Sequence, residues 1–464
     1  MDGIIMYKIN FQQPIPIHFI GIGGISMSGL AEILLKERFP ISGSDKKESR
    51  LTQKLTELGA SIFYGQSADH ILEETQLVVY TAAIHADNPE LREAKQRNLP
   101  LLTRAELLGQ IMENYQHSIG VAGTHGKTTT TSMLTQILLA AQSDPTVSVG
   151  GILPTIGGNI RIGDSQVFLT EACEYTNSFL KLNPRYALIL NIGEDHLDFF
   201  KDLDEIRHSF REFAGKVPAD GKVIINGEIE RFTEITADTQ GSVITYGLTP
   251  STEYYAGDIQ FHAHGCTSFT LFHQQAPLGT IQLQVPGVHN VSNATAAAAL
   301  ALEMGISFAD TAKGLSEFTG TERRFEYKGM LNEITVIDDY AHHPAEISVT
   351  LDAAAKYSSG RIVCVFQPHT YTRTQKFLKQ FARELSKADL VILADIYAAR
   401  ETNTLGISSR DLLFELQQLG CACHYFPSFD EIENYLLNEC KNGDLLITMG
   451  AGDIVQVGEH LLGR

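Results

Sequence analysis

The sequence has no apolar run that approaches the roughly 18 residues needed for a membrane-spanning helix. Its N-terminus also lacks the pattern of a secretory signal peptide. We therefore expect a cytoplasmic protein with no part inserted in a membrane.

Cysteine is scarce, with six residues in a chain of 464 and no Cys-x-x-Cys pair. Cys421 and Cys423 are separated by one residue, which is too close for a usual zinc site. We therefore expect buried thiols and no zinc centre.

Positive charge is in the minority, because 36 lysines and arginines face 55 aspartates and glutamates, giving a formal net charge of −19. This balance argues against a broad nucleic-acid-binding surface, although a nucleotide can still bind in a local pocket. Hydrophobic residues make up 43% of the chain and charged residues 20%, which is typical of a folded globular protein. We expect no nucleic-acid partner.

Short β-rich apolar runs alternate with helix-like stretches along the chain, which predicts a parallel α/β architecture. A chain of this length is expected to form two to four domains. The pattern divides it into three blocks, with boundaries near residues 112 and 320. Between about 240 and 288, short alternating segments predict a small antiparallel patch ahead of an alanine-rich helix at Ala294–Ala301.

A lysine-bearing glycine loop is the strongest functional signal. It follows an apolar run and precedes a helix-like pattern, and it contains Gly123, Thr124, His125, Gly126, Lys127, Thr128 and Thr129. Such a loop can hold a nucleotide polyphosphate, because backbone N–H groups and the lysine face the anion and the threonine hydroxyl can bind Mg²⁺. The usual motif needs a glycine where this chain has Val121, so the loop is a shortened variant.

An earlier glycine turn contains Gly21, Gly23 and Gly24. It matches the dinucleotide fingerprint in part, since Ser26 stands in place of the third glycine, and Asp45 lies where a ribose-binding acid is expected. The turn predicts a diphosphate-bearing ligand at a helix N-terminus. NAD is one candidate, and a tight turn needed only for packing is the alternative.

Polar residues follow several other predicted strands. Glu171 is well placed for Mg²⁺ near bound phosphates, and His196 beside Asp195 suits a metal or a phosphate. Arg323 and Arg324 follow a predicted hinge and suit a transferring phosphoryl group. The remaining strand-end segments, which together predict a crevice, are Asp338–Pro344, Gln367–Arg373 and Gly450–Ile454.

Together these motifs resemble the Mur ligase family of peptidoglycan synthesis, over essentially the whole chain. The resemblance is carried by Gly21–Ala31, Gly123–Thr129, Asp339–Pro344 and His369–Arg373. It implies an α/β fold of three domains: a Rossmann-like UDP-sugar domain at residues 1–112, a central P-loop-type ATPase domain at 113–320, and a Rossmann-like amino-acid domain at 321–464. It also implies that the first glycine turn holds a UDP diphosphate instead of NAD.

The resemblance implies an ATP-dependent ligase that forms a peptide-like bond through an acyl phosphate, with ATP and Mg²⁺ as cofactors. Ligases of later steps in the family carry a lysine where this chain has Phe210, which favours the first step. That step joins L-alanine to the lactyl carboxylate of UDP-N-acetylmuramate. Two alternatives are a ligase that adds a preformed tripeptide to the same sugar in cell-wall recycling, and a nicotinamide-dependent oxidoreductase.

Correspondence with the family also implies residue roles. Lys127, Arg324 and Mg²⁺ would neutralise the transferring phosphate, with Thr128 and Glu171 at one Mg²⁺ and His196 at a second. His342 is the candidate proton acceptor. The implied UDP-sugar residues are Gly21, Gly23, Gly24, Ser44, Asp45 and Thr81. The implied ATP residues outside the loop are His289, Asn290, Asn293, Arg324 and Asp339, and the amino-acid residues are Tyr340, His342, His369 and Arg373.

Overall fold

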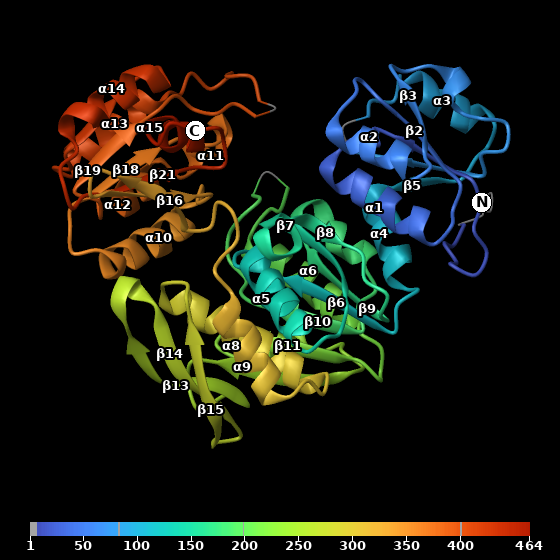
Figure 1. Ribbon diagram of the computed structural model, residues 1–464, viewed down its shortest axis with the longest axis horizontal. Coiled ribbons are helices and arrows are strands. Elements are labelled where there is room, and N and C mark those ends of the chain that lie inside the picture. The colour runs from blue at the N-terminus through green and yellow to red at the C-terminus, as the bar shows by residue number, and fades with distance from the viewer. Residues whose placement is uncertain (1–6, 82–83, 198, 400) are drawn as a thin grey trace. The chain divides into compact units, whose positions relative to one another are not determined.

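The structure is a computed structural model that describes residues 7–81, 84–197, 199–399 and 401–464 (Figure 1). Its internal contacts divide the chain into two compact units. The first consists of Met1–Lys127, Gln142–Val149 and Asn159–Thr245. The second consists of Thr128–Ala141, Gly150–Gly158 and Tyr246–Arg464.

Five parallel strands form the first sheet, in the order β3-β2-β1-β4-β5. They are β1 (Ile17–Ile20), β2 (Ile41–Asp45), β3 (Ser61–Tyr64), β4 (Leu77–Tyr80) and β5 (Leu101–Thr103). The accompanying helices are α1 (Ile25–Lys36), α2 (Arg50–Glu57), the 3-10 helix η1 (Ala68–His70), α3 (Pro89–Gln96) and α4 (Arg104–Met112). Every residue of the central strand β1 is buried, as expected where a parallel sheet is covered on both faces.

Ten strands form the second sheet, in the order β15-β14-β13-β12-β11-β10-β6-β9-β7-β8. The strands are β6 (His117–Ala122), β7 (Thr146–Leu153), β8 (Gly158–Arg161), β9 (Val167–Ala172), β10 (Tyr186–Ile189), β11 (Lys222–Asn226), β12 (Ser242–Gly247), β13 (Tyr254–Phe261), β14 (Thr267–His273) and β15 (Ala276–Leu283). Strands β13, β14 and β15 pair antiparallel, which confirms the predicted antiparallel patch.

The helical segments of this middle part include the helix after the lysine loop and the predicted alanine-rich helix. They are α5 (Lys127–Ala140), η2 (Pro154–Ile156), η3 (Tyr175–Lys181), α6 (Leu203–Gly215), α7 (Phe232–Ile235), η4 (Ala263–Gly265), α8 (Val288–Glu303) and α9 (Phe308–Glu317). Helix α8 contains the whole run Ala294–Ala301, and these eight residues are buried. Small alanine side chains allow close packing of this helix along its length.

Six strands form the third sheet, in the order β16-β17-β21-β18-β19-β20. They are β16 (Glu326–Leu331), β17 (Ile334–Asp339), β18 (Ile362–Phe366), β19 (Leu390–Leu393), β20 (Cys423–Tyr425) and β21 (Leu445–Met449). The helices are α10 (Pro344–Tyr357), α11 (Tyr371–Lys376), α12 (Leu378–Leu385), α13 (Ser409–Gln418), α14 (Phe429–Glu439) and α15 (Val455–Leu461). Strand β16 runs antiparallel to β17, and the other pairs are parallel.

The predicted α/β class is confirmed, because a parallel sheet, a mixed sheet and a second largely parallel sheet follow one another along the chain. The expectation of buried thiols is wrong for most of the cysteines. Cys364 is buried in a central strand, whereas Cys173 is exposed and the other four are partly exposed. Cys423 begins β20, an edge strand, and Cys421 lies two residues before it, so the burial of both is incomplete.

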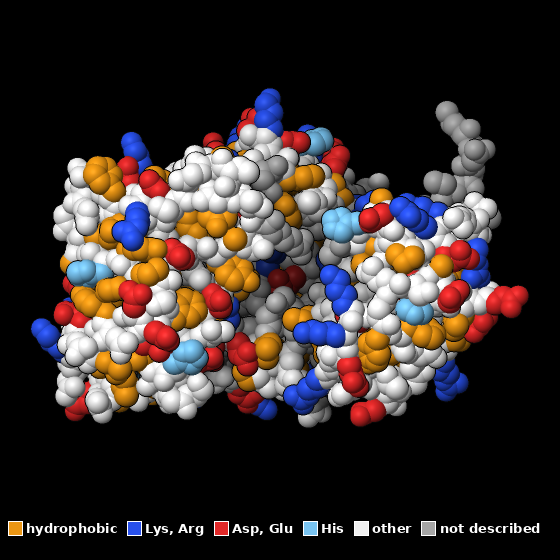
Figure 2. Space-filling view, turned by 90° about the horizontal axis from the view of Figure 1, so that it is seen from above, with side chains coloured by type: hydrophobic (Ala, Val, Ile, Leu, Met, Phe, Trp, Pro, Cys, Tyr) orange, Lys and Arg blue, Asp and Glu red, His pale blue; other side chains and the backbone are white. Residues whose placement is uncertain are grey.

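Across the described residues, no helix is both long enough and apolar enough to cross a membrane. On the face shown in Figure 2, lysine and arginine side chains are interspersed with aspartate and glutamate side chains. This mixed surface agrees with the acidic composition and differs from the continuous basic surface of proteins that bind long nucleic acids.

Candidate active site

The lysine loop joins β6 to α5, as predicted from sequence. Gly123 and Gly126 have positive φ angles of 149° and 83°, which favour glycine. A Cβ atom on Gly123 would lie 2.9 Å from Leu190 Cβ, so no larger residue fits there without movement. The two glycines are therefore required by the shape of the loop.

The segment that follows β10 fixes the backbone of this loop. Asn191 Oδ1 accepts a hydrogen bond from His125 N at 2.8 Å, and Asn191 Nδ2 donates to His125 O at 2.9 Å. Thr124 Oγ1 accepts from Gly193 N at 2.9 Å. Asn191 and Gly193, which follow β10, thus hold the lysine loop in its conformation.

The Lys127 ammonium group is directed back toward its own loop. Nζ donates to Gly123 O at 2.5 Å and to Thr124 O at 3.2 Å. It also donates to both carboxylate oxygens of Glu174, at 3.2 and 3.0 Å. Burial is the largest influence and would lower the pKa of Lys127, but the combined effects of Glu174, Cys173 and Glu171 outweigh it, and the pKa of Lys127 lies above its ordinary value. The lysine therefore stays charged.

Glu174 is absent from the predicted site residues, yet it connects two of them. Its side chain is 2% exposed, and its Oε1 lies 3.8 Å from His196 Nε2. His196 has a positive φ of 51° and its ring lies 4.6 Å from the Tyr175 ring. The position of Glu174 three residues after Glu171, in the same strand-end segment, is the signal that could have identified it.

No three His, Cys, Asp or Glu side chains of the described chain are grouped so that they could hold a metal ion without further ligands. Mg²⁺ does not need such a cluster, because it usually keeps several waters and binds one or two carboxylates together with substrate phosphates. Glu171 is partly exposed at the carboxyl end of β9, and Thr128 is the second residue of α5. Both residue types therefore suit Mg²⁺ that arrives with a nucleotide.

The first glycine turn lies against the end of β2. Gly21 has a φ of 83°, and its N–H donates to Ser44 O at 2.9 Å. Gly23 N donates to Asp45 Oδ2 at 2.9 Å, and a Cβ atom on Gly23 would lie 2.8 Å from the same oxygen. Asp45 thus lies beside the turn, as its spacing predicted. Thr81 is also adjacent, since its Cγ2 would lie 3.0 Å from a Cβ on Gly21.

The order of the third sheet makes β17, β21 and β18 neighbours, so the three predicted strand-end segments lie along one edge. Arg323 joins two of them. Its Nη1 donates to Gly452 O at 2.9 Å and its Nη2 to Gly450 O at 2.7 Å, while Nε donates to Asp338 Oδ2 at 3.0 Å. Arg323 therefore holds the segments together.

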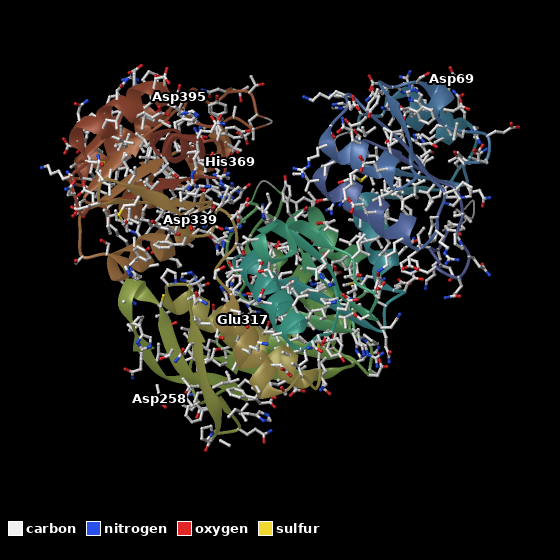
Figure 3. The ribbon with its side chains drawn as sticks, in the orientation of Figure 1. Asp69, Asp258, Glu317, Asp339, His369 and Asp395 are labelled. Carbon is white, nitrogen blue, oxygen red and sulfur yellow. The ribbon has the colours of Figure 1, made fainter. Side chains whose placement is uncertain are left out.

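Arg324 lies over the Tyr340 ring, with 5.1 Å between the guanidinium carbon and the ring centre. Asp339, labelled in Figure 3, accepts hydrogen bonds from Ala341 N at 2.8 Å and from Phe325 N at 2.7 Å. Burial raises the pKa of Asp339 to about 6 in spite of the nearby Arg324. Both oxygens of Asp339 thus fix the turn that carries Arg324.

The four predicted amino-acid residues are brought together. The rings of His342 and His369 lie 5.6 Å apart, the His342 ring lies 5.4 Å from Tyr340, and Arg373 Nη1 lies 3.4 Å from His369 Nδ1. Burial, together with His342 and Arg373, lowers the pKa of His369 to about 4, so its ring is neutral at pH 7. His369 also stacks on Tyr397 at 5.7 Å, and Figure 3 labels His369 near Asp339.

His342 has a defined tautomer when it is neutral. Its Nδ1 lies 3.0 Å from Tyr340 O and 3.3 Å from Glu346 Oε2. Both oxygens are acceptors, so Nδ1 carries the hydrogen and Nε2 carries the lone pair. Nε2 is therefore the nitrogen able to accept a proton.

His289, Asn290 and Asn293 lie in the first turns of α8. Asn290 Nδ2 donates to Pro286 O at 2.7 Å, and Asn293 Nδ2 donates to Asn290 Oδ1 at 3.3 Å. Burial and the nearby Lys356 lower the pKa of His289 to about 4. The three residues therefore lie together at the start of α8, and their side chains carry no charge at pH 7.

Comparison with known proteins gives matches along nearly the whole chain. Models described as Mur ligase family, catalytic domain, Mur ligase middle domain, and Mur ligase, glutamate ligase domain match residues 16–116, 121–301 and 323–452. The sequence is 61% identical to UDP-N-acetylmuramate–L-alanine ligase from Agathobacter rectalis over 457 residues, covering 98% of this chain and 100% of the relative.

Two solved structures share the fold over 97% of this chain and 98% of their own. The UDP-N-acetylmuramate-alanine ligase from Thermotoga maritima has a TM-score of 0.79 and 29% sequence identity. A murein peptide ligase from Psychrobacter arcticus has a TM-score of 0.69 and 25% identity.

Proposed function

Because the chain belongs to the Mur ligase family, we propose that it joins L-alanine to the lactyl carboxylate of UDP-N-acetylmuramate, giving UDP-N-acetylmuramoyl-L-alanine, ADP and phosphate. The observation that carries this proposal is the match to the Agathobacter rectalis ligase over that enzyme's entire length. The reaction belongs to peptidoglycan synthesis, and so to cell-wall biogenesis, cell shape and cell division. We place it in the cytoplasm.

In the first step, a lactyl carboxylate oxygen attacks the γ-phosphorus of ATP, and the bond from that phosphorus to ADP breaks. Phosphoryl transfer depends mainly on positioning and on charge neutralisation. We assign this neutralisation to Lys127 and Arg324. Mg²⁺ supplies further positive charge when bound, with Thr128 and Glu171 at one ion and His196 at a second.

Glu174 is an anion that shares the Lys127 ammonium group with the phosphate we propose to bind there. Its carboxylate pairs with Lys127 at 3.0 Å and occupies the ammonium group to which a phosphate would bind. Two anions compete for one cation, so the polyphosphate of ATP has to draw Lys127 away from Glu174.

In the second step, the amine of L-alanine attacks the acyl carbon of the acyl phosphate, and phosphate leaves with its bridging oxygen. The amine loses a proton, which we assign to Nε2 of His342. Arg373 suits the carboxylate of the amino acid because its planar guanidinium donates two parallel hydrogen bonds. His369, neutral at pH 7, and Tyr340 complete this site.

The remaining assignments follow the three domains proposed from sequence, residues 1–112, 113–320 and 321–464. The first would hold the UDP-sugar at Gly21, Gly23, Gly24, Ser44, Asp45 and Thr81. The second would hold ATP at Gly123, Thr124, His125, Gly126, Lys127, Thr128, Thr129, His289, Asn290 and Asn293. The third would supply Arg324 and Asp339 to ATP and bind the amino acid.

The two alternatives receive less support. The similarity to a murein peptide ligase is 25% identity, against 61% to the alanine ligase. A nicotinamide-dependent oxidoreductase would use only the turn at Gly21 and Asp45, and would leave the lysine loop without a purpose.

Release of ADP from ATP and Mg²⁺ tests the proposal, with UDP-N-acetylmuramate as the acceptor and single amino acids or a tripeptide as the amine. We expect release that requires both the sugar nucleotide and L-alanine. Release stimulated only by the tripeptide, or release that needs no amine, would contradict the proposal.

A further inference from the structure

A closed set of polar side chains surrounds Glu90 of α3. Glu90 has no exposed surface. Its Oε2 accepts from Ser44 Oγ at 2.6 Å and lies 3.1 Å from His18 Nε2. Its Oε1 lies 3.1 Å from His70 Nδ1 and accepts from Ser67 N at 3.4 Å. Two oxygens with four donors match the full acceptor capacity of an ionised carboxylate.

The charge on Glu90 is maintained by these partners. Burial is the largest influence and would raise the pKa of Glu90, but the combined effects of His18, Ser44 and His70 outweigh it and lower the pKa below its ordinary value. A buried charge is costly compared with an apolar side chain of similar size, and an incomplete set of partners is costlier still. Moving any partner away from Glu90 is therefore costly, so the buried carboxylate holds its partner groups in one orientation.

The group that Glu90 orients, the Ser44 hydroxyl, lies on the strand end that contacts the first glycine turn. Ser44 ends β2 together with Asp45, and its main-chain oxygen accepts from both Gly21 N and Ile22 N at 2.9 Å. Asp45 then accepts from Gly23 N at 2.9 Å. Two consecutive residues at the end of β2 thus fix three consecutive residues of the turn.

We propose that Glu90 is a positioning residue for the UDP-sugar: by holding the Ser44 hydroxyl it fixes the end of β2, and with it the turn that receives the diphosphate. Glu90 is fully buried, so it acts through Ser44 and does not touch the ligand. The identity of that ligand rests on the proposed function. Ser44, 1% exposed and bonded to Glu90, then serves mainly as the link between carboxylate and turn.

Calorimetric titration of the full chain with UDP-N-acetylmuramate, and separately with an ATP analogue and Mg²⁺, tests this inference. Glu90→Gln removes the charge but keeps the shape. We expect the Kd for the sugar nucleotide to rise about ten-fold, the size expected for one lost charge-assisted hydrogen bond, and the Kd for the ATP analogue to stay within about two-fold. Equal loss for both ligands, or no loss for the sugar nucleotide, would overturn the inference.

Asn88→Ala is the matched control, because Asn88 Oδ1 caps the same helix by accepting from Leu91 N at 3.0 Å. This variant should lower the melting temperature while leaving the Kd for the sugar nucleotide unchanged. A rise equal to that of Glu90→Gln would assign the effect to the stability of α3 alone and would overturn the inference.

A double-mutant cycle with Ser44→Ala shows whether Glu90 acts through Ser44. We expect Glu90→Gln to raise the Kd less than two-fold when Ser44 is already alanine, because the shared link is lost. Fully additive effects would overturn the inference.

If Glu90→Gln does not fold, His70→Ala, which removes a partner of the same carboxylate, must raise the Kd at least two-fold, and an unchanged Kd overturns the inference. If the unaltered protein binds no UDP-N-acetylmuramate, the proposed function itself is wrong.

Discussion

Both carboxylate oxygens of Glu174 accept hydrogen bonds from the Lys127 ammonium group, at 3.2 and 3.0 Å. This buried ion pair links the lysine loop to the strand-end acids of β9, two features that sequence identifies separately. The pair also contributes to the raised pKa of Lys127, which keeps the ammonium group charged. We therefore expect changes at either residue of the pair to alter activity or nucleotide binding.

Replacing Lys127 by alanine should lower kcat by at least about 10³-fold, because a cation that we assign to the transferring phosphate is lost. The fold should be retained, as judged by circular dichroism and thermal unfolding. Lys54→Ala is the control, since Lys54 pairs with Glu32 at the surface and its side chain is 55% exposed. Substantial activity in Lys127→Ala would show that the loop does not act on phosphate.

Replacing Glu174 by glutamine should strengthen the binding of an ATP analogue with Mg²⁺ by about five-fold, because one negative charge beside the phosphate loop is removed. Calorimetric titration measures the change. Glu234→Gln, which removes an acid paired with Arg231 at the surface, should leave the affinity unaltered. Weaker binding in Glu174→Gln would mean that Glu174 supports the nucleotide instead of competing with it.

Replacing Asp339 by asparagine should lower the free energy of unfolding by about 1–3 kcal/mol, because an amide NH₂ group would face one of the two backbone donors, Phe325 N or Ala341 N. The kcat should also fall about ten-fold, since the turn that carries Arg324 is displaced. Denaturant unfolding and steady-state rates measure the two effects. Asp352→Asn, at an exposed position, is the control; equal stability of the two variants would contradict this account.

Two histidines should make the protein less stable in acid. His289 and His369 have pKa values of about 4 in the folded chain, against an ordinary 6.5. Between these values the unfolded state binds more protons, so stability is lost as the pH falls from about 6.5 to about 4. Asp339, with its pKa raised to about 6, acts in the opposite sense, because it favours folding at low pH.

The contribution of His369 to the pH dependence of stability is isolated by comparing the unaltered protein with His369→Asn from pH 7 to pH 4.5. The variant lacks this titration, so the stability advantage of the unaltered protein should shrink as the pH falls, while the contribution of Asp339 cancels. Denaturant unfolding at each pH measures the difference. A constant difference for His369→Asn would contradict the lowered pKa.

Some strand ends were predictable from sequence because a largely apolar segment stops there at a glycine or a polar residue. For this reason Gly123 and Asp45 appear where sequence placed them, the first at the end of β6 and the second beside the first glycine turn. Chain topology then brings separate strand ends to the same edge of a sheet.

Side-chain partners were not predictable in the same way. Arg323 and Arg324 are adjacent in sequence, and both guanidinium groups lie over the Tyr340 ring, at 5.0 and 5.1 Å. Arg323, which has a positive φ of 59°, also donates to the main-chain oxygens of Gly450 and Gly452. Glu174 was not assigned to the site because its main contact is with a lysine 47 residues away in the sequence. Such pairs depend on backbone turns that the local pattern of residue types does not fix.

Transfer of an oxygen label tests the central claim most directly, namely that the lactyl carboxylate attacks the γ-phosphate of ATP. UDP-N-acetylmuramate labelled with ¹⁸O in its lactyl carboxylate is converted with ATP, Mg²⁺ and L-alanine, and the released phosphate is analysed by mass spectrometry. The account predicts one ¹⁸O atom in each phosphate formed, because the acyl phosphate gives up its bridging oxygen when the amine attacks. Phosphate without ¹⁸O would contradict it.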